Sequence, residues 1–420
     1  MKKYDLRGFY TLCVSLLLLL YSCDDKINTV EDPHFTEDGY FIADSTDMDS
    51  FVPSSPSQIK FYVEVSGSMN GFFRANKPTQ FKADVWQILS HYSQISPNVT
   101  ILTNNGDMGA SFAMSDFRTK MNTGAFVSSA STKVPLMLQS IIDDIHPDEG
   151  EVAVLISDMK YSPVGAAAPD VLLTQYSTDI SKILGNYGKA VSLIGATSDY
   201  LDKNGNTMTD KSPYYFFIIG NGEQVASVRN VISSLLEMAD HLIDNIDSGF
   251  DYGQVSCSFG IPNGCIQLEE EPTFVDLEED TCTIRMKINL ENYRWIITNP
   301  EIFAKAFEVK TLYGSNVSVE NIEFDIQNIT NQAGKNILVR KATAIVDLKV
   351  YNLALDSEVV EWSIALPDTE ISLFAPYFGA TNDNDVTKSY SVDSFIIGIF
   401  KGGVVNKSLK PSYILISKNQ

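Results

Sequence analysis

Short apolar segments alternate with amphipathic segments in the middle of the chain, and this alternation restricts the possible folds more than any other feature of the sequence. The clearest buried strand is the apolar run at residues 151–156. Further strands are expected at 60–65, 98–102, 111–114, 190–195 and 214–219, and helices at about 81–92, 138–145, 170–185 and 223–243. Strands that alternate with helices predict a mainly parallel sheet with helices on both faces. We therefore expect a doubly wound, Rossmann-like α/β domain over residues 58–245.

The pattern changes near residue 254, after which strand-like segments are separated by polar turns. Residues 282–288 alternate strictly between apolar and polar side chains, as in a half-buried strand. Further strands are expected at 306–312, 317–324, 343–350, 359–365 and 413–417, and a helix near 300–306, whereas 394–400 fits either type. Regularly spaced short strands favour an antiparallel sandwich. We expect residues 254–420 to form an all-β, immunoglobulin-like domain that serves as a spacer or a second contact surface.

The N-terminus has the layout of an export signal. Lys2, Lys3 and Arg7 precede an apolar run at residues 9–21, and Cys23 follows that run directly after a serine. A basic start followed by a short apolar run is typical of secretory signal peptides. The alternative for Cys23 is an incidental cysteine behind an ordinary cleaved signal.

The Leu-Tyr-Ser-Cys sequence that ends at Cys23 resembles the lipobox of bacterial lipoproteins. The resemblance implies a signal peptide at residues 1–22, a lipid on Cys23 and an outer-membrane location in the bacterial cell envelope. The acidic pair Asp24-Asp25 resembles the surface-export signals of Bacteroidetes-type lipoproteins, which implies exposure on the cell surface. Residues 23–57 are rich in Asp, Ser, Thr and Pro and predict a flexible tether.

The charge of the chain excludes one class of partner. Its formal net charge is -22, which repels nucleic acid and anionic lipid headgroups. We therefore expect no nucleic-acid binding, and membrane contact only through the lipid on Cys23.

Three of the five cysteines fall close together, at Cys257, Cys265 and Cys282. Their spacing matches no zinc site. In an exported protein one pair could close a disulfide, and Cys257–Cys265 would close the shortest loop. Free buried cysteines are an equally ordinary alternative.

Three polar clusters are expected at one edge of the predicted sheet. They are residues 64–68 after the first strand, residues 128–132 before a helix, and Ser157-Asp158 after the strand at 151–156. In parallel sheets, ligands bind beyond the carboxyl ends of the strands. The clusters supply carboxylate and hydroxyl oxygens, which suit Mg²⁺, Mn²⁺ or Ca²⁺. We therefore expect a divalent-cation site at this edge.

The run Glu64-Val65-Ser66-Gly67-Ser68 resembles Asp-x-Ser-x-Ser, the first metal-site motif of the von Willebrand factor A family. The resemblance extends over about residues 58–245, including the order of the elements. It implies a metal-ion-dependent adhesion site in which Ser66 and Ser68 bind the cation directly. It also implies that Thr132 adds a third ligand and that Asp158 is reached through water.

The chain departs from the family pattern at two of these positions. Glu64 stands where the family has aspartate and is one methylene longer, so that its carboxylate would act on the metal's waters. Ser129 and Ser131 are close alternatives to Thr132. The alternative for the whole site is an A-type fold without a metal, in which Ser66 and Ser68 only shape a tight turn.

Phe72, Phe73 and Arg74 lie in a stretch between the serines and the next helix, on the rim of the expected site. They are predicted to contact a partner, although such aromatic residues more often cover the domain's own core.

These features predict an adhesion or scaffolding lipoprotein that binds a protein or peptide partner, whose carboxylate completes the coordination of the cation. A metal-independent platform in an envelope complex is the alternative. No enzyme activity is expected, because the sequence shows no nucleophile–base pair, Gly-x-Ser-x-Gly elbow or phosphate-binding loop.

Overall fold

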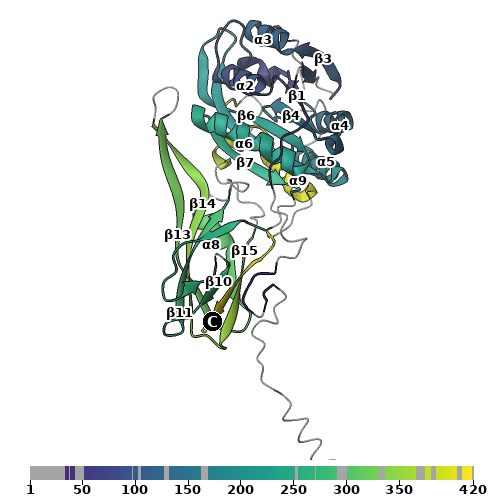
Figure 1. The fold of residues 1–420 in the computed structure, drawn as a ribbon. Coiled ribbons are helices and arrows are strands. Elements are labelled where there is room, and N and C mark those ends of the chain that lie inside the picture. The colour runs from purple at the N-terminus through teal and green to yellow at the C-terminus, as the bar shows by residue number, and fades with distance from the viewer. Residues whose placement is uncertain are drawn as a thin grey trace, which may run out of the picture.

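The chain forms an α/β unit and a β unit, which lie one above the other in Figure 1. The computed structural model describes residues 34–36, 38–42, 52–96, 98–102, 106–126, 132–161, 169–250, 254–269, 271–290, 300–330, 336–365, 374–379, 385–403 and 409–418. The predicted signal peptide at 1–22 and Cys23 lie outside the described residues. Among the residues that are described, no helix is long and apolar enough to cross a membrane.

A seven-stranded sheet of order β3-β2-β1-β4-β6-β5-β7 forms the centre of the α/β unit. Its strands are β1 (Gln58–Glu64), β2 (Asn98–Leu102), β3 (Met108–Ala113), β4 (Glu151–Ser157), β5 (Ala190–Leu201), β6 (Thr207–Gly220) and β7 (Leu242–Ser248). β1 pairs in parallel with both β2 and β4, whereas β3 is an antiparallel edge strand. The prediction of parallel strands therefore holds for this half of the sheet.

The other half of the sheet is antiparallel. β6 lies between β4 and β5 and runs against both, and β7 runs against β5. The cause is local, because β5 and β6 are joined by a tight turn in which Asp202 Oδ1 accepts the N–H groups of Asn204 and Asn206, both at 2.8 Å. Such a turn leaves no room for a crossover helix, which parallel neighbours require. The sheet is therefore mixed.

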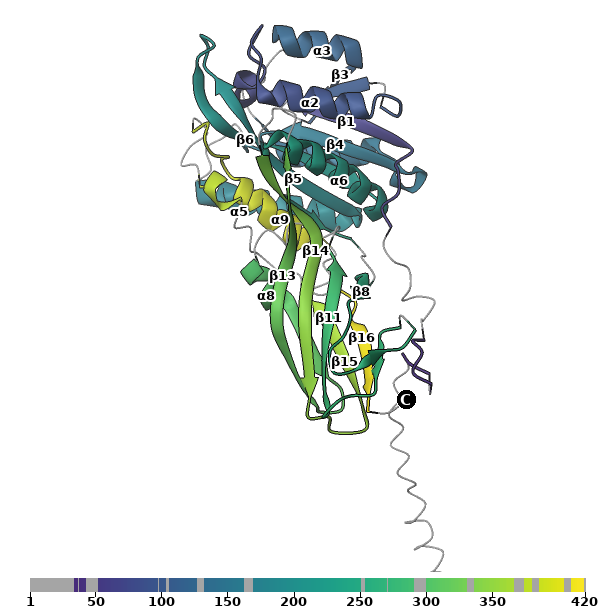
Figure 2. The ribbon, with the colours of Figure 1, turned by 60° about the vertical axis from the view of Figure 1, so that its left-hand side comes forward.

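Helices cover both faces of this sheet (Figures 1 and 2). They are α2 (Gln80–His91), α3 (Met114–Thr123), α4 (Val134–Asp144), α5 (Pro169–Tyr187), α6 (Gly222–Ala239) and α9 (Val392–Gly402), with short 3-10 helices at η1 (Gly67–Gly71), η2 (Pro147–Glu149) and η4 (Ala375–Tyr377). Alternate side chains of β4 face opposite sides, so that Val154 joins the core under α2 and α6, and Leu155 joins the core under α4, α5 and α9. The doubly covered sheet agrees with the predicted α/β class.

Helix α9 comes from the C-terminal third of the chain but packs on α5 of the α/β unit. Its residues Phe395, Ile396 and Ile399 are fully buried in the same core as Ile180 of α5. The segment at 394–400, for which the sequence left helix and strand open, is therefore helical. It lies within the range 254–420 that was predicted to form the sandwich, yet it covers the sheet of the other unit.

Two sheets form the β unit, as the strand-rich pattern predicted. One has the order β12-β15-β16-β10-β9 and the other β13-β14-β11-β8. Their elements are β8 (Cys257–Phe259), β9 (Ile266–Gln267), β10 (Thr273–Val275), β11 (Thr281–Asn289), α8 (Pro300–Ala306), β12 (Phe307–Thr311), β13 (Asn316–Thr330), β14 (Asn336–Tyr351), β15 (Ser357–Ile364) and β16 (Ser412–Ser417). Ile284 and Leu348 from one sheet and Trp362 from the other share one buried core. All pairs are antiparallel except β10 with β16.

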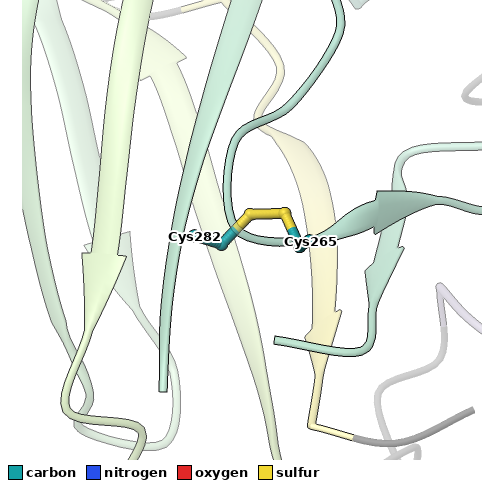
Figure 3. The surroundings of a disulfide bond; sticks show 2 residues. All are labelled: Cys265 and Cys282. Atoms are coloured by element: carbon teal, nitrogen blue, oxygen red, sulfur yellow. A yellow bond between two sulfur atoms is a disulfide. The ribbon is translucent and has the colours of Figure 1, made fainter. Parts of the chain in front are cut away.

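A disulfide joins Cys265 to Cys282 in the β unit (Figure 3). The predicted shortest pairing, Cys257–Cys265, was wrong. Cys257 lies in β8 opposite Ile288 at the far end of β11 from Cys282, whereas the Cα atoms of Cys265 and Cys282 are 5.6 Å apart, an ordinary disulfide separation. Cys257 forms no disulfide with either described cysteine.

Part of the predicted tether packs on the β unit. Phe35 is buried in a small cluster with Val359 of β15 and Leu415 of β16. Tyr40 donates a hydrogen bond to Glu269. Residues 34–36 and 38–42 therefore contact the folded β unit, although they lie within the range 23–57 that was expected to be flexible.

Candidate functional site

The predicted cluster residues meet at one edge of the seven-stranded sheet. Glu64 ends β1 and Ser157 ends β4, and the two strands are parallel neighbours with Val63 opposite Ile156. Asp158 follows β4, and Thr132 lies just before α4. Ser129 and Ser131, the alternatives to Thr132, lie outside the described residues.

Glu64 is fully buried in the site, with an exposed fraction of 0%. Its Oε1 accepts a hydrogen bond from the Thr132 hydroxyl at 3.0 Å, and its Oε2 accepts one from the Ser157 hydroxyl. Burial and the nearby negative charge of Asp158 raise the pKa of Glu64 to about 7, while hydrogen bonds from Ser157, Ser66 and Thr132 oppose the increase. Glu64 thus ties the three clusters together.

Ser157 is a residue of the site that the predicted ligand set did not contain. Its hydroxyl donates to Glu64 and accepts the N–H of Met159 at 2.8 Å. The sequence signal for Ser157 was its place in the polar pair Ser157-Asp158, which directly follows the apolar strand at 151–156. Its contact with Glu64 uses the glutamate side chain, which is one methylene longer than aspartate.

Ser66 and Ser68 lie side by side at the start of η1, with their Oγ atoms 2.8 Å apart. The Tyr200 hydroxyl donates a hydrogen bond to the carbonyl of Ser68 at 2.9 Å and so holds the loop. Gly71 lies against the ring of Tyr200, where a Cβ atom would be only 2.3 Å from the ring carbons. The serine loop is therefore fixed by close contact with the β5–β6 hairpin.

Asp158 contributes a buried carboxylate that the surrounding protein satisfies only in part. The residue is 1% exposed, and its Oδ1 accepts the N–H of Lys160 at 3.2 Å. Its Oδ2 is buried and has no hydrogen-bond partner among the described residues. Buried carboxylate oxygens are normally satisfied, since an unmet one costs free energy. This oxygen is suited to a ligand that carries positive charge.

The donor set of this edge fits a hard divalent cation. It offers the orphaned Asp158 Oδ2 and the hydroxyls of Ser66, Ser68 and Thr132, all of them oxygen. The described part of the chain contains no group of three or more His, Cys, Asp or Glu residues placed to hold a metal. A cation here would therefore depend on hydroxyl ligands, and Glu64 would act indirectly, by accepting a hydrogen bond from the Thr132 hydroxyl.

The three predicted rim residues divide into two groups. Phe72 and Phe73 are only 1% and 5% exposed, and both pack edge-on or tilted against Phe81 of α2. These aromatic side chains cover the domain's own core, the alternative that the sequence had left open, and offer little surface to a partner. Arg74 remains half-buried at the rim, where its Nη2 donates to the carbonyl of Leu201 at 3.2 Å.

Comparison of the chain with protein-family models, curated proteins and solved structures finds no match in any of the three. The residues of the site, their burial and their hydrogen bonds therefore carry the functional argument alone.

Proposed function

We propose that this chain is an exported adhesion or scaffolding lipoprotein of the bacterial cell envelope, with a von Willebrand factor A-type α/β unit that binds a protein or peptide through a divalent cation. The observation that carries the proposal is the buried Asp158 Oδ2, which has no hydrogen-bond partner among the described residues and lies at the sheet edge that also holds Ser66 and Ser68. Mg²⁺ is the cation we favour, with Mn²⁺ or Ca²⁺ as substitutes.

The donor chemistry supports partner capture. Ser66, Ser68 and Thr132 bring no negative charge, so a cation held by them and by one oxygen of Asp158 keeps most of its positive charge. Such a cation favours an additional anionic ligand. A carboxylate from the partner would complete its coordination.

The arrangement of the two units supports a spacer role for the β unit, which we propose to be an immunoglobulin-like sandwich. β7 ends at Ser248, which pairs with Val191 near the start of β5, and the next strand along the chain is β8 of the β unit. β5 ends at Leu201, which receives a hydrogen bond from Arg74 beside the site. The site and the step from β7 to β8 therefore lie at opposite ends of β5, whereas Asp385 and Ser389, which precede α9, contact Lys160 and Asp158 beside the site. A lipid on Cys23 would anchor the chain beside the β unit, on which residues 34–36 and 38–42 pack. The site would then face away from the membrane.

The test compares two double variants of the full chain. Ser66→Ala with Asp158→Ala is expected to abolish both Mg²⁺-dependent thermal stabilisation and EDTA-sensitive capture of a partner from envelope extracts. Ser111→Ala with Asp148→Asn makes similar changes at exposed positions on β3 and η2 and is expected to retain both. Unchanged behaviour of the first variant would refute the proposal.

A metal-independent platform is the second candidate, and one observation favours it. Both oxygens of the Glu64 carboxylate accept hydrogen bonds from protein hydroxyls, those of Thr132 and Ser157, so the centre of the site is stable without a cation. Partner capture that persists in EDTA would support this candidate.

A further inference from the structure

A small polar pocket lies directly beside the candidate cation site. Ser66 forms part of its wall, together with Asn70, Phe73, Arg74, Gly124 and Phe126. Its volume is about 100 Å³. Since one water occupies roughly 30 Å³ in the liquid, the pocket can hold a carboxylate group.

Arg74 supplies the positive charge of this pocket. Its Nη2 is bound to the carbonyl of Leu201, but its Nε is buried and has no hydrogen-bond partner in the part of the chain that the structure describes. A buried guanidinium N–H without an acceptor is costly, and a carboxylate is the acceptor whose planar geometry fits it best. The described residues supply no acceptor for Arg74 Nε, and a carboxylate in the pocket would provide one.

The segment that carries Arg74 is fixed before any ligand arrives. The buried Lys82 ammonium donates to the carbonyls of Arg74 and Lys77 at 2.7 and 2.9 Å. The Thr79 hydroxyl donates to the carbonyl of Phe72 at 2.8 Å. The N–H of Asn76 donates to the carbonyl of Asn122 in α3 at 2.8 Å. A fixed segment loses little conformational entropy on binding, which favours affinity.

The local charge also favours an acidic ligand. Although the whole chain carries a net charge of -22, the Arg74 side chain lines this pocket and the Lys82 ammonium lies 2.7 Å from the carbonyl of Arg74. An acidic segment would be repelled by most of the surface and attracted here, so the charge distribution adds specificity.

We propose that the Arg74 pocket binds a second carboxylate of the same partner segment, so that the site recognises two acidic side chains close together in one peptide. One carboxylate binds the cation held by Ser66, Ser68 and Asp158, and the other accepts hydrogen bonds from Arg74. Ser66 borders both subsites, so the two carboxylates are neighbours on the partner. This inference rests on the proposed cation site and specifies what that site selects.

The experiment is calorimetric titration of the full chain, saturated with Mg²⁺, with end-blocked peptides. One series carries two glutamates separated by none, one or two residues, and a matched series carries one glutamate and one glutamine. We expect the best two-glutamate peptide to bind at least about tenfold more tightly than its matched peptide, as one charge-assisted hydrogen-bonded pair would give.

Variants of Arg74 assign that difference to the pocket. Arg74→Gln is expected to remove the preference, so that the two-glutamate peptide binds it no more tightly than the matched one-glutamate peptide. Arg74→Lys keeps the charge but not the guanidinium N–H groups, and is expected to lose most of the preference. Arg118→Gln is the matched control, because Arg118 is exposed on the neighbouring α3, over the Trp86 ring, and is expected to keep the preference.

The outcomes separate the two proposals. If Mg²⁺ and the one-glutamate peptide bind but the second glutamate adds nothing, or adds the same in Arg74→Gln, the Arg74 inference is overturned and the proposed function stands. If Mg²⁺ does not bind to the unaltered chain, the proposed function is overturned and this inference with it.

Discussion

Glu64 and Asp158 place two carboxylates in one buried site, and this juxtaposition controls how the site responds to protons. Burial and the charge of Asp158 raise the pKa of Glu64 to about 7 from its ordinary value of 4.5. Between these two values the folded chain binds more protons than the unfolded chain, so Glu64 alone makes stability fall as the pH rises through this window. A bound cation would favour the ionised carboxylate of Glu64 and would therefore lower the pKa of Glu64 in the folded chain.

The first prediction concerns the pH dependence of Mg²⁺ binding. Below pH 7 the cation must displace the proton of Glu64, so we expect affinity to rise by up to about tenfold per pH unit and to level off above the pKa. Calorimetric titration between about pH 5.5 and 8 measures this. Glu64→Gln is expected to flatten the profile, and a flat profile in the unaltered chain would contradict the prediction.

His241 gives a second pH-dependent contribution, away from the site. Its Nδ1 lies 2.7 Å from Oδ2 of the buried Asp84, which also accepts the hydroxyl of Tyr214 at 2.7 Å. The hydrogen bond to Asp84 raises the pKa of His241 above its ordinary value of 6.5. The stabilisation is therefore complete below pH 6.5 and is lost as the pH rises through the higher, folded-state pKa.

The second prediction follows from the loss of the His241 stabilisation as the pH rises. His241→Gln is expected to destabilise the protein more at low pH than at high pH, with a difference of about 1 kcal/mol or less because the ring is partly exposed. Urea unfolding on either side of neutrality measures the difference. His91→Gln, at an exposed position of α2, serves as the control and is expected to show no such dependence. An equal loss at both pH values in His241→Gln would argue against the ion pair.

The sequence predicted the meeting of the site residues but not all of their environments. Glu64, Ser66 and Asp158 could be placed together because strand ends of parallel neighbours share an edge. The sequence left open whether Phe72 is buried, because its burial depends on Tyr200 and Tyr214, which a distant hairpin brings over the loop. Whether a loop side chain is buried or exposed depends on residues that are distant in the sequence.

At the scale of elements, local periodicity identified strands and helices far better than it identified their pairing. The strands expected at 190–195 and 214–219 lie within the longer β5 and β6, and the helix expected at about 81–92 is α2, which Thr79 caps by accepting the N–H of Lys82. The antiparallel placement of β6 depends on the turn at 202–206 and on residues of β4. Alternation of strand and helix therefore predicted the layers but not the strand directions.

The third prediction tests the contact between α5 and α9. Gly398 packs so closely on α5 that an added Cβ atom would lie 2.7 Å from Cβ of Ile180 and 2.9 Å from the carbonyl oxygen of Ser177. Gly398→Ala is expected to destabilise the protein by about 1–3 kcal/mol through overpacking, as measured by chemical unfolding.

The adjacent residue provides the control for this prediction. Ile397 is 40% exposed on the same helix, and Ile397→Ala is expected to cost less than about 1 kcal/mol, since little apolar contact is lost. Equal effects at the two positions would show that α9 does not depend on its close approach to α5.

At the scale of the whole molecule, neither unit is a continuous stretch of chain. The last strand of the α/β sheet ends at Ser248. One face of this sheet is covered by α4, α5 and α9, and α9 comes from the C-terminal third of the chain. The change of sequence pattern near residue 254 marks where the β unit begins, but pattern alone could not indicate that residues 392–402 cross back.

The fourth prediction compares two deletions. A chain in which a Gly/Ser linker replaces residues 392–402 loses α9 but keeps β16, and it leaves Tyr176, Ile180 and Leu184 uncovered, so we expect it to bind hydrophobic dyes and to lose cooperative thermal unfolding of the α/β unit. A chain in which a Gly/Ser linker replaces residues 254–365 keeps α9 and is expected to retain a cooperative α/β transition. Cooperative unfolding of the first deletion would show that α9 is dispensable.

The return of α9 also fixes when the α/β unit can mature. During synthesis its strands emerge first, but the helix that seals α5 emerges only after β8 to β15 of the β unit. The α/β unit therefore cannot complete its core until residue 402 has been made. A prematurely terminated product would expose an apolar helix surface, which marks it for proteolysis and separates it from finished molecules.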